Sequence, residues 1–337
     1  MIIVLKPQHT PKELNALLRE IRRLGYKPHV MRGVARTVIG AIGDERSHPS
    51  LDALCAWSQV ESVTPIQKRH KLVSREAHPQ NSTIRVRDVV IGGPELVVMA
   101  GPCSVESEQQ ILETAHAVKA AGAKILRGGA FKPRTSPYEF QGLGEKGLKL
   151  LAKARKETGL PVITELLSED HAELVAEYAD ILQIGARNAQ NFQLLIAAAK
   201  TGKPVLLKRG LSMRIEEWLS AGEYVLSNDN AGLMFCERGI RTFETYTRNT
   251  LDLSAVPIMK NETHCPVVID PSQGTGRADL VVAMCKGAVA MGADALLVEV
   301  HPNPKAAKSD SAQQLSLEAF GKMMAELRPF AQAAGRE

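Results

Sequence analysis

Short β-branched hydrophobic runs alternate with longer amphipathic segments from about residue 96 to the end of the chain. The eight runs read LVVMAGPC, KILRGG, PVITE, ILQIGAR, PVLLKRG, LMFCERG, PVVIDPS and ALLVEV. Between most of them the apolar positions recur with helical spacing, and most of these helical segments stop at a glycine. Strand–helix alternation through eight units predicts an α/β protein with a (β/α)8 TIM barrel rather than an open doubly wound sheet.

Nearly every predicted strand ends at a residue whose side chain can take part in chemistry. A core strand has no physical reason to end on an arginine or a glutamate. In a parallel barrel, however, the active site is assembled at the C-terminal ends of the strands. The sequence therefore predicts an active site drawn from these strand ends: Cys103, Arg127, Glu165, Arg187, Lys208, Arg238, Asp270 and Glu299.

The part of the chain before the barrel predicts a separate small domain. Residues 1–66 contain strand-like and helical segments in the order βαββαβ, the ferredoxin-like arrangement, with a tight turn expected at Gly33. Residues 67–82 are polar and predict a linker. Residues 83–337 then form the predicted barrel, which starts with a hairpin that we expect to close its bottom.

Composition excludes several classes of protein. The chain has 337 residues, 44% of them hydrophobic, and no apolar stretch long enough to span a membrane. Aromatic residues make up only 4% and no run of like charges occurs, which disfavours nucleic acid as a partner. Five cysteines without a CxxC pair, and no signal peptide, predict reduced thiols in a cytoplasmic protein.

Basic residues are concentrated at or just beyond the predicted strand ends. Each could simply pair with an acidic strand end and hold the barrel rim together. Eight cations converging on one face instead favour one or two binding sites for phosphate or carboxylate groups. These cations are Arg127, Lys132, Arg134, Arg187, Lys208, Arg209, Arg238 and Arg241.

A candidate metal site lies on the first, seventh and eighth predicted strands and the loops after them. A thiol together with carboxylates suits Mn²⁺, Fe²⁺ or Zn²⁺ better than Ca²⁺. The competing interpretation is that the cysteine is a small buried apolar residue. The candidate ligands are Cys103, Gln273, Glu299, His301 and Asp310. The residues alone thus predict a barrel enzyme, with or without a metal, that acts on small phosphorylated molecules.

Several motifs extend this interpretation: GPCSVES, LRGGAFKPRTSPYEFQGLGEKG, LQIGARNAQNFQLL, PVLLKRG, CERGIRTFE, NTLDLSAVP and IDPSQGTGRADL. With them the chain resembles the 3-deoxy-D-arabino-heptulosonate 7-phosphate (DAHP) synthases, in particular the microbial subgroup with an N-terminal ferredoxin-like regulatory domain. The resemblance implies condensation of phosphoenolpyruvate with D-erythrose 4-phosphate to DAHP and phosphate, the first step of the shikimate pathway of aromatic amino acid biosynthesis.

Two alternatives to this activity remain. The sister 3-deoxy-octulosonate 8-phosphate synthases carry a KANRSS-type sequence where this chain reads KPRTSP, which favours DAHP synthase. The other alternative is a non-catalytic barrel that binds phosphorylated ligands and has a degraded metal site.

The resemblance also implies roles for individual residues. It assigns phosphoenolpyruvate to Arg127, Lys132, Arg187, Lys208 and Arg238. It assigns the phosphate of the sugar to Arg134, Thr135 and Ser136. It names as catalytic Lys132, Glu165, which would face the reacting carbons through a water, and Cys103. It further implies a homotetramer and an aromatic amino acid effector bound in the small domain near His29.

The chain departs from the family pattern at Gln273, because the family usually reads DPSH where this chain reads DPSQ. Three interpretations are open. Cys103, Glu299 and Asp310 keep a divalent metal with Gln273 as a weak fourth ligand, which we favour; His301 substitutes; or the site works with little or no metal. An amide oxygen binds borderline metals less well than an imidazole. Chelators are therefore expected to inactivate the enzyme readily, and Gln273→His to raise metal affinity.

Overall fold

The computed structural model describes every residue except 33–35, 44–46, 65–69 and 337. The chain divides into two compact units, Met1–Arg69 and His70–Glu337, and each is described here by itself. Among the described residues, no helix is both long enough and apolar enough to cross a membrane.

The first unit is a four-stranded antiparallel sheet with the strand order β2-β3-β1-β4. Its elements are β1 (Ile2–Leu5), α1 (Pro11–Arg23), β2 (Lys27–Arg32), β3 (Thr37–Ile42) and β4 (Val60–Thr64). The ferredoxin-like prediction is confirmed, with a short 3-10 helix (Asp52–Ala56) as the second helical segment. The turn predicted at Gly33 lies outside the described residues.

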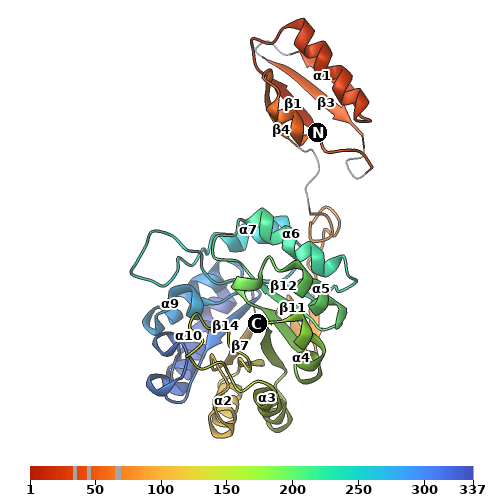
Figure 1. Cartoon of the computed structure of the whole chain (residues 1–337). Coiled ribbons are helices and arrows are strands. Elements are labelled where there is room, and N and C mark those ends of the chain that lie inside the picture. Colours follow the sequence, from red (N-terminus) through yellow and green to blue (C-terminus); the bar gives the residue numbers. More distant parts are fainter. Residues whose placement is uncertain (33–35, 44–46, 65–69, 337) are drawn as a thin grey trace. The chain divides into compact units, whose positions relative to one another are not determined.

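The second unit is a closed barrel of eight parallel strands, which confirms the predicted TIM barrel. Figure 1 shows its helices arranged around the strands. The strands are β7 (Val97–Gly101), β8 (Ile125–Arg127), β9 (Val162–Leu166), β10 (Ile181–Ile184), β11 (Val205–Lys208), β12 (Leu233–Glu237), β13 (Val267–Ile269) and β14 (Ala295–Glu299). The helices are α2 (Glu108–Ala120), α3 (Glu145–Thr158), α4 (Ala172–Tyr178), α5 (Phe192–Lys200), α6 (Ile215–Leu226), α7 (Ala255–Glu262), α8 (Pro271–Thr275), α9 (Ala278–Ala290) and α10 (Leu317–Ala333).

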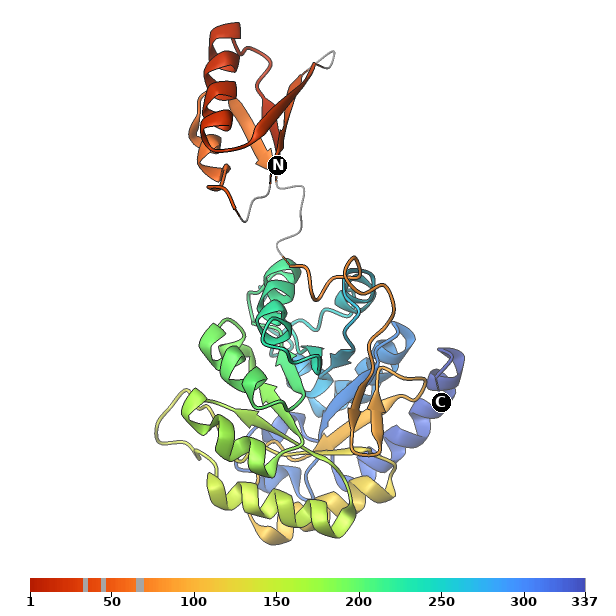
Figure 2. The same cartoon turned by 90° about the vertical axis from the view of Figure 1, so that its right-hand side faces the viewer.

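A hydrophobic plug fills one end of the barrel interior. The hairpin β5 (Ile84–Val86) and β6 (Val89–Ile91) packs its apolar side chains against inward-facing strand residues such as Met99, Ile163 and Leu206. Figure 2 shows the backbone of the barrel unit, with this segment in orange. The predicted hairpin therefore closes this end of the barrel. The polar strand ends that could form a site are left at the opposite, C-terminal end.

Two α-helices of the described barrel unit, α7 and α8, were not predicted, and α8 changes the position of a site residue. Helix α8 starts directly after β13, with Asp270 as its N-cap and Pro271 at its first position. The Asp270 carboxylate accepts a hydrogen bond from the backbone N–H of Gln273 at 2.9 Å, which satisfies a free donor of the first turn. Gln273 therefore lies within a short helix, neither on the seventh predicted strand nor in a loop after it.

The end of the linker is attached to the barrel unit by specific hydrogen bonds. Three successive backbone N–H groups, from residues 71–73, donate to the carboxylate of Glu223 at 2.8–3.1 Å. The Nε2 atom of His264 lies 2.8 Å from the Leu72 carbonyl oxygen, so this nitrogen carries the proton. The Nδ1 atom then accepts from the Ser82 hydroxyl at 2.7 Å. His264 is thus held as a neutral imidazole.

Candidate active site

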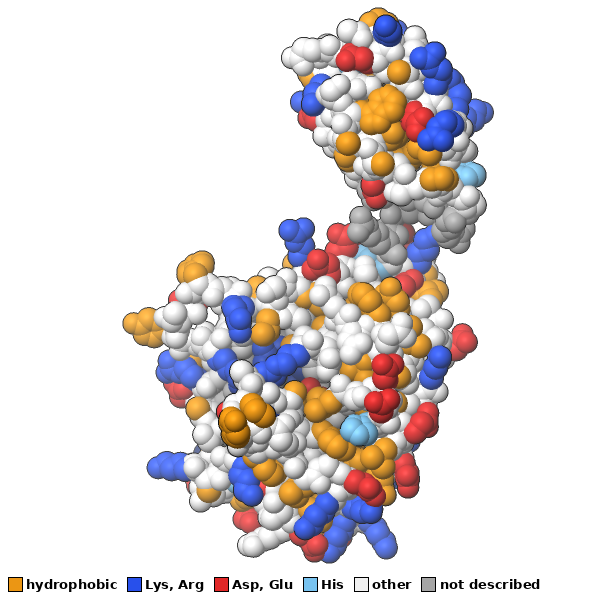
Figure 3. All heavy atoms as spheres, in the orientation of Figure 1, with side chains coloured by type: hydrophobic (Ala, Val, Ile, Leu, Met, Phe, Trp, Pro, Cys, Tyr) orange, Lys and Arg blue, Asp and Glu red, His pale blue; other side chains and the backbone are white. Residues whose placement is uncertain are grey.

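The C-terminal strand ends and the loops after them surround a cleft of about 370 Å³. Seven cationic side chains line it, against three acidic ones, Glu139, Glu165 and Asp310. Lysine and arginine side chains gather on the face of the barrel unit shown in Figure 3. This excess of positive charge fits an anionic ligand. The cations are Lys132, Arg134, Arg187, Lys208, Arg238, Arg241 and Arg248.

The structure separates the predicted cations into two groups. Six of the eight line the cleft, whereas Arg127 and Arg209 do not. Arg209 donates to Glu237 at 3.0 Å and to Asp252 at 2.9 Å, so the prediction that it faces the ligand is wrong. Arg248 was missed because it lies in a long loop between β12 and α7, away from any strand end.

Two cations meet at one amide oxygen in the wall of the cleft. Lys208, at the end of β11, donates to Asp270 at 2.6 Å and to the Gln273 Oε1 atom at 3.2 Å. Arg238, just after β12, donates to the same Oε1 atom at 3.1 Å. Burial alone would raise the pKa of Asp270, but Lys208 and Arg127 lower it overall, so this carboxylate stays ionised.

Glu165, near the end of β9, is an acidic residue of the cleft wall that fits the predicted catalytic role. Among the described residues, none donates a hydrogen bond to its carboxylate. Its Oε1 atom occupies the space that a Cβ atom at position 185 would need, so any larger residue there would displace the Glu165 carboxylate. Gly185 itself follows β10 and also lines the cleft. The carboxylate is therefore free to act on a bound molecule or on a water.

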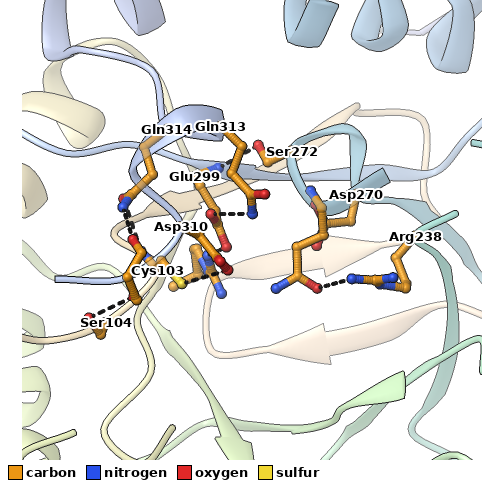
Figure 4. A network of polar contacts seen from close by, with 12 residues as sticks. Cys103, Ser104, Arg238, Asp270, Ser272, Glu299, Asp310, Gln313 and Gln314 are labelled. Atoms are coloured by element: carbon orange, nitrogen blue, oxygen red, sulfur yellow. Dashed lines mark hydrogen bonds and ion pairs between the residues drawn. The ribbon is translucent and has the colours of Figure 1, made fainter. Parts of the chain in front are cut away.

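A sulfur atom and two carboxylates converge beside the cleft, as Figure 4 shows. The ligand atoms of Cys103, Glu299 and Asp310 all lie within 4.8 Å of one another. Cys103 Sγ lies 3.3 Å from Asp310 Oδ2, and the Lys132 ammonium group donates to Sγ at 3.1 Å. This donor set fits a borderline divalent cation such as Mn²⁺, Fe²⁺ or Zn²⁺. Burial raises the pKa of the Cys103 thiol to about 12, so without a cation the group stays protonated.

The other two candidate ligands, His301 and Gln273, lie outside this cluster. His301 Nδ1 accepts from the backbone N–H of Asn303 at 3.0 Å, and its Nε2 atom lies 3.6 Å from a carboxylate oxygen of Glu106. In the part of the chain that the structure describes, no histidine joins the metal cluster, so the interpretation that His301 substitutes is wrong. The Gln273 amide oxygen already accepts two hydrogen bonds from cations.

A set of polar residues that the sequence did not reveal orients the cluster. Gln313 donates to Glu299 Oε2 at 2.8 Å, and its own amide oxygen accepts from Arg248 at 3.1 Å. Arg248 also donates to Asp310 at 3.1 Å. Gln314 accepts from the backbone N–H of Cys103 at 3.1 Å. Such outer partners fix ligand orientation in metal sites, but neutral glutamines carry no sequence signal of that role.

The loop predicted to bind the sugar phosphate lies partly in the cleft. Arg134 and Thr135 line it, and Arg134 Nε donates to Glu139 at 2.8 Å. Ser136 does not belong to the lining; its hydroxyl accepts from the backbone N–H of Tyr138 at 3.3 Å. The predicted effector residue, His29, is an exposed residue of β2 in the first unit.

Fold and site together define an anion-binding barrel enzyme with a candidate metal centre. Comparisons with known proteins narrow this class. Residues 64–333 match the DAHP synthetase I family, and residues 1–68 match the DAHP synthase ferredoxin-like domain. The chain belongs to the DAHP synthetase I family, and it carries that ferredoxin-like domain in front of its barrel.

Individual relatives agree with this assignment. Phospho-2-dehydro-3-deoxyheptonate aldolase of Thermotoga maritima is 50% identical over 335 residues, covering 99% of both chains. A crystal structure of the Thermotoga maritima protein superposes with a TM-score of 0.95 at 49% identity, over 100% of this chain and 98% of that one. The 2-dehydro-3-deoxyphosphooctonate aldolase of Caulobacter vibrioides is 34% identical, over 74% of this chain and 91% of its own.

Proposed function

We propose that the cleft catalyses the DAHP synthase reaction, in which phosphoenolpyruvate and D-erythrose 4-phosphate give DAHP and inorganic phosphate. The observation that carries this proposal is one cleft lined by Lys208, Arg238 and the Arg134–Thr135 loop, with Glu165 in its wall. Two phosphorylated reactants need two sets of anion-binding groups, and holding both reactants in one site supplies much of the rate.

Phosphoenolpyruvate is assigned to the cations that line the cleft: Lys132, Arg187, Lys208 and Arg238. Arg127 pairs with Glu299 at 2.7 Å outside the lining, so we assign it to holding that carboxylate. The phosphate of the sugar is assigned to Arg134 and Thr135, because the Ser136 hydroxyl is engaged within its own loop.

The chemistry follows from these positions. The C3 atom of phosphoenolpyruvate forms a bond to the aldehyde carbon of the sugar, and the aldehyde oxygen takes up a proton to become a hydroxyl. Water adds at C2, where Glu165 orients it and accepts its proton. The C–O bond to phosphate then breaks, and Lys208 and Arg238 stabilise the departing anion.

Cys103, Glu299 and Asp310 would hold a divalent metal beside the cleft. When bound, such a metal supplies Lewis-acid stabilisation of the negative charge that develops on the aldehyde oxygen. Gln273 is not included among its ligands, because both hydrogen bonds to its amide oxygen come from cations.

Phosphate release tests the activity directly. The enzyme is incubated with phosphoenolpyruvate and either D-erythrose 4-phosphate or D-arabinose 5-phosphate, first with chelator and then with Mn²⁺, Fe²⁺ or Zn²⁺ restored. Release with the four-carbon sugar only is the expected result. Preference for arabinose 5-phosphate would instead support the octulosonate activity, and no release with either sugar would support a non-catalytic binding barrel.

The small domain is proposed to bind an aromatic amino acid near His29 and thereby to regulate the barrel, in a homotetramer. This rests on the match of residues 1–68 to the DAHP synthase ferredoxin-like domain. Calorimetric titration with tyrosine, phenylalanine and tryptophan tests the effector, and sedimentation equilibrium tests the assembly. Absence of binding by all three would overturn the regulatory proposal.

A further inference from the structure

The side chain of Gln273 joins the two cations that lie deepest in the cleft wall. Its Oε1 atom accepts from Lys208 Nζ at 3.2 Å and from Arg238 Nη2 at 3.1 Å. Lys208 is 1% exposed and Arg238 is 6% exposed, so water screens their mutual repulsion only weakly. A shared acceptor allows both positive charges to stay close together.

The Gln273 amide is a neutral acceptor, and this determines how much positive charge the two cations keep for an anionic ligand. Asp270 already neutralises Lys208, with Nζ and Oδ2 2.6 Å apart. A second carboxylate in place of Gln273 would also neutralise Arg238 and leave little attraction for an anion. Within the described residues, the Nε atom of Arg238 has no hydrogen-bond partner. Arg238 thus keeps both net charge and an unused donor for a ligand in the cleft.

The backbone around Gln273 is fixed, so the amide group has a defined position. Its backbone N–H donates to Asp270 Oδ1 at 2.9 Å, and its carbonyl oxygen accepts from Asn249 Nδ2 at 3.0 Å. Asp270 therefore holds both Lys208 and the first turn of α8 that carries Gln273. Because these hydrogen bonds fix the backbone of Gln273, its amide group is already in position before a ligand binds.

The same contacts argue against Gln273 as a metal ligand. An amide oxygen has two lone pairs, and here each accepts one hydrogen bond from a cation. Coordination would require breaking these hydrogen bonds and placing a divalent cation next to Lys208 and Arg238. The electrostatic cost of that arrangement is high in a buried site.

We propose that Gln273 is a positioning residue for the anion site: its amide oxygen sets Lys208 and Arg238 for the phosphate or carboxylate group of phosphoenolpyruvate. The candidate metal centre consequently has three protein donors, Cys103, Glu299 and Asp310. This inference rests on the proposed function for the identity of the anion. The role of Gln273 in anion binding itself does not require turnover.

The test uses two variants of the full chain, Gln273→Met, which keeps the size but removes the acceptor, and Gln273→Glu, which keeps an acceptor but adds a negative charge. Calorimetry measures binding of phosphoenolpyruvate without the sugar, and competition with a chromophoric chelator measures metal affinity. For Gln273→Met we expect about tenfold weaker phosphoenolpyruvate binding, typical of losing one hydrogen bond to a charged group. Metal affinity and the KM for erythrose 4-phosphate stay unchanged.

For Gln273→Glu we expect weaker phosphoenolpyruvate binding than for Gln273→Met, because the new carboxylate competes with the ligand for both cations. A purely structural role would instead affect both variants through stability and would change the binding of both substrates. Gln190→Met, at an exposed position, is the matched control and leaves each measurement unchanged.

The opposite result would overturn the proposal: Gln273→Met weakens metal binding and leaves phosphoenolpyruvate binding unchanged. Inorganic phosphate is the second probe for the wild-type enzyme. If the wild type binds phosphoenolpyruvate or phosphate but does not turn over with erythrose 4-phosphate, the proposed function fails while the role of Gln273 is still measured. If the wild type binds neither probe, the role of Gln273 is rejected as well.

Discussion

Arg127 and Glu299 form an ion pair of 2.7 Å in which both side chains are almost completely buried. The two residues end β8 and β14, the strands on either side of β7. Glu299 also accepts a hydrogen bond from Gln313 at 2.8 Å. The pair thus connects the ends of β8 and β14 across β7 and holds a candidate metal ligand in place.

Removing one member of this pair should destabilise the barrel strongly. Arg127→Met leaves Glu299 as an uncompensated buried charge, which typically costs about 3–5 kcal/mol. Urea unfolding followed by circular dichroism measures the loss. The double variant Arg127→Met/Glu299→Met should recover part of it. Additive losses in the double variant would show that the two side chains do not interact in this way.

Glu165 should affect turnover rather than binding. Glu165→Gln keeps the shape of the side chain but cannot accept a proton, so we expect kcat to fall by about 10²–10⁴-fold, the usual contribution of a general base. The KM values for both substrates should change little. Continuous phosphate release measures both quantities. A variant with wild-type kcat would exclude Glu165 from the chemical step.

Cys103 should determine metal retention. Cys103→Ser replaces the sulfur donor of the cluster, and the loss of affinity should exceed the roughly 10–100-fold that loss of an outer hydrogen-bond partner costs. Dialysis against increasing concentrations of a chelator, followed by metal analysis, measures the loss of metal affinity. Cys55→Ser is the control, because Cys55 is an exposed thiol of the first unit. Equal metal content in both variants would remove Cys103 from the ligand set.

Glu139 should compete with the sugar phosphate for Arg134. The two side chains are paired at 2.8 Å, and Glu139 is 46% exposed. Solvent screens such an exposed pair, so Glu139→Gln should lower the KM for erythrose 4-phosphate by no more than about fivefold. Arg134→Met should raise the same KM. If neither substitution changes it, the sugar phosphate binds elsewhere.

The stability of the barrel unit should depend on the protonation of His264. Burial, with His78 and Arg75, lowers the pKa of His264, while the hydrogen bond to the Leu72 carbonyl and the charge of Glu223 oppose the shift. The unfolded chain therefore binds this proton more readily than the folded one, so stability falls as the pH decreases through and below the ordinary histidine value of 6.5. The stability of the barrel unit is retained at pH values above the ordinary histidine pKa.

Urea unfolding at a series of pH values measures this dependence. His264→Gln cannot titrate, and its unfolding midpoint should vary less between pH 7 and pH 5, a range chosen to bracket the histidine pKa of about 6.5. Ser82→Ala removes the hydroxyl that donates to Nδ1 and should cost about 1 kcal/mol above pH 7. Identical pH profiles for wild type and His264→Gln would contradict this assignment.

The barrel itself was predictable, because short buried apolar runs alternate with helical segments through eight units and most of the runs end on a polar or charged residue. The same logic singled out Glu165, Lys208 and Arg238, and all three line the cleft. It assigned Arg209 wrongly, because a charged residue at a strand end can equally pair with a neighbouring loop. Whether Arg209 faces the cleft or pairs with a loop depends on where Asp252 lies in the folded chain.

The orientation of Gln273 could not be derived from the sequence. A DPSQ segment can continue a strand end or start a helix, and the capping bond from its backbone N–H to Asp270 decides for the helix. The partners of its amide oxygen come from β11 and from the residue after β12. Hydrogen bonds between residues 35 or more positions apart leave no local pattern.

The hydrophobic plug formed by the hairpin at residues 84–91 determines the end at which molecules enter and leave the barrel. A barrel that is closed at one end can be entered only from the other end. In the described part of the barrel, the plug leaves the C-terminal end as the way in for both reactants and the way out for both products. Lys208 is almost inaccessible to solvent, so a group that binds against it lies deep in the cleft. A second molecule can then meet that group only from the C-terminal side.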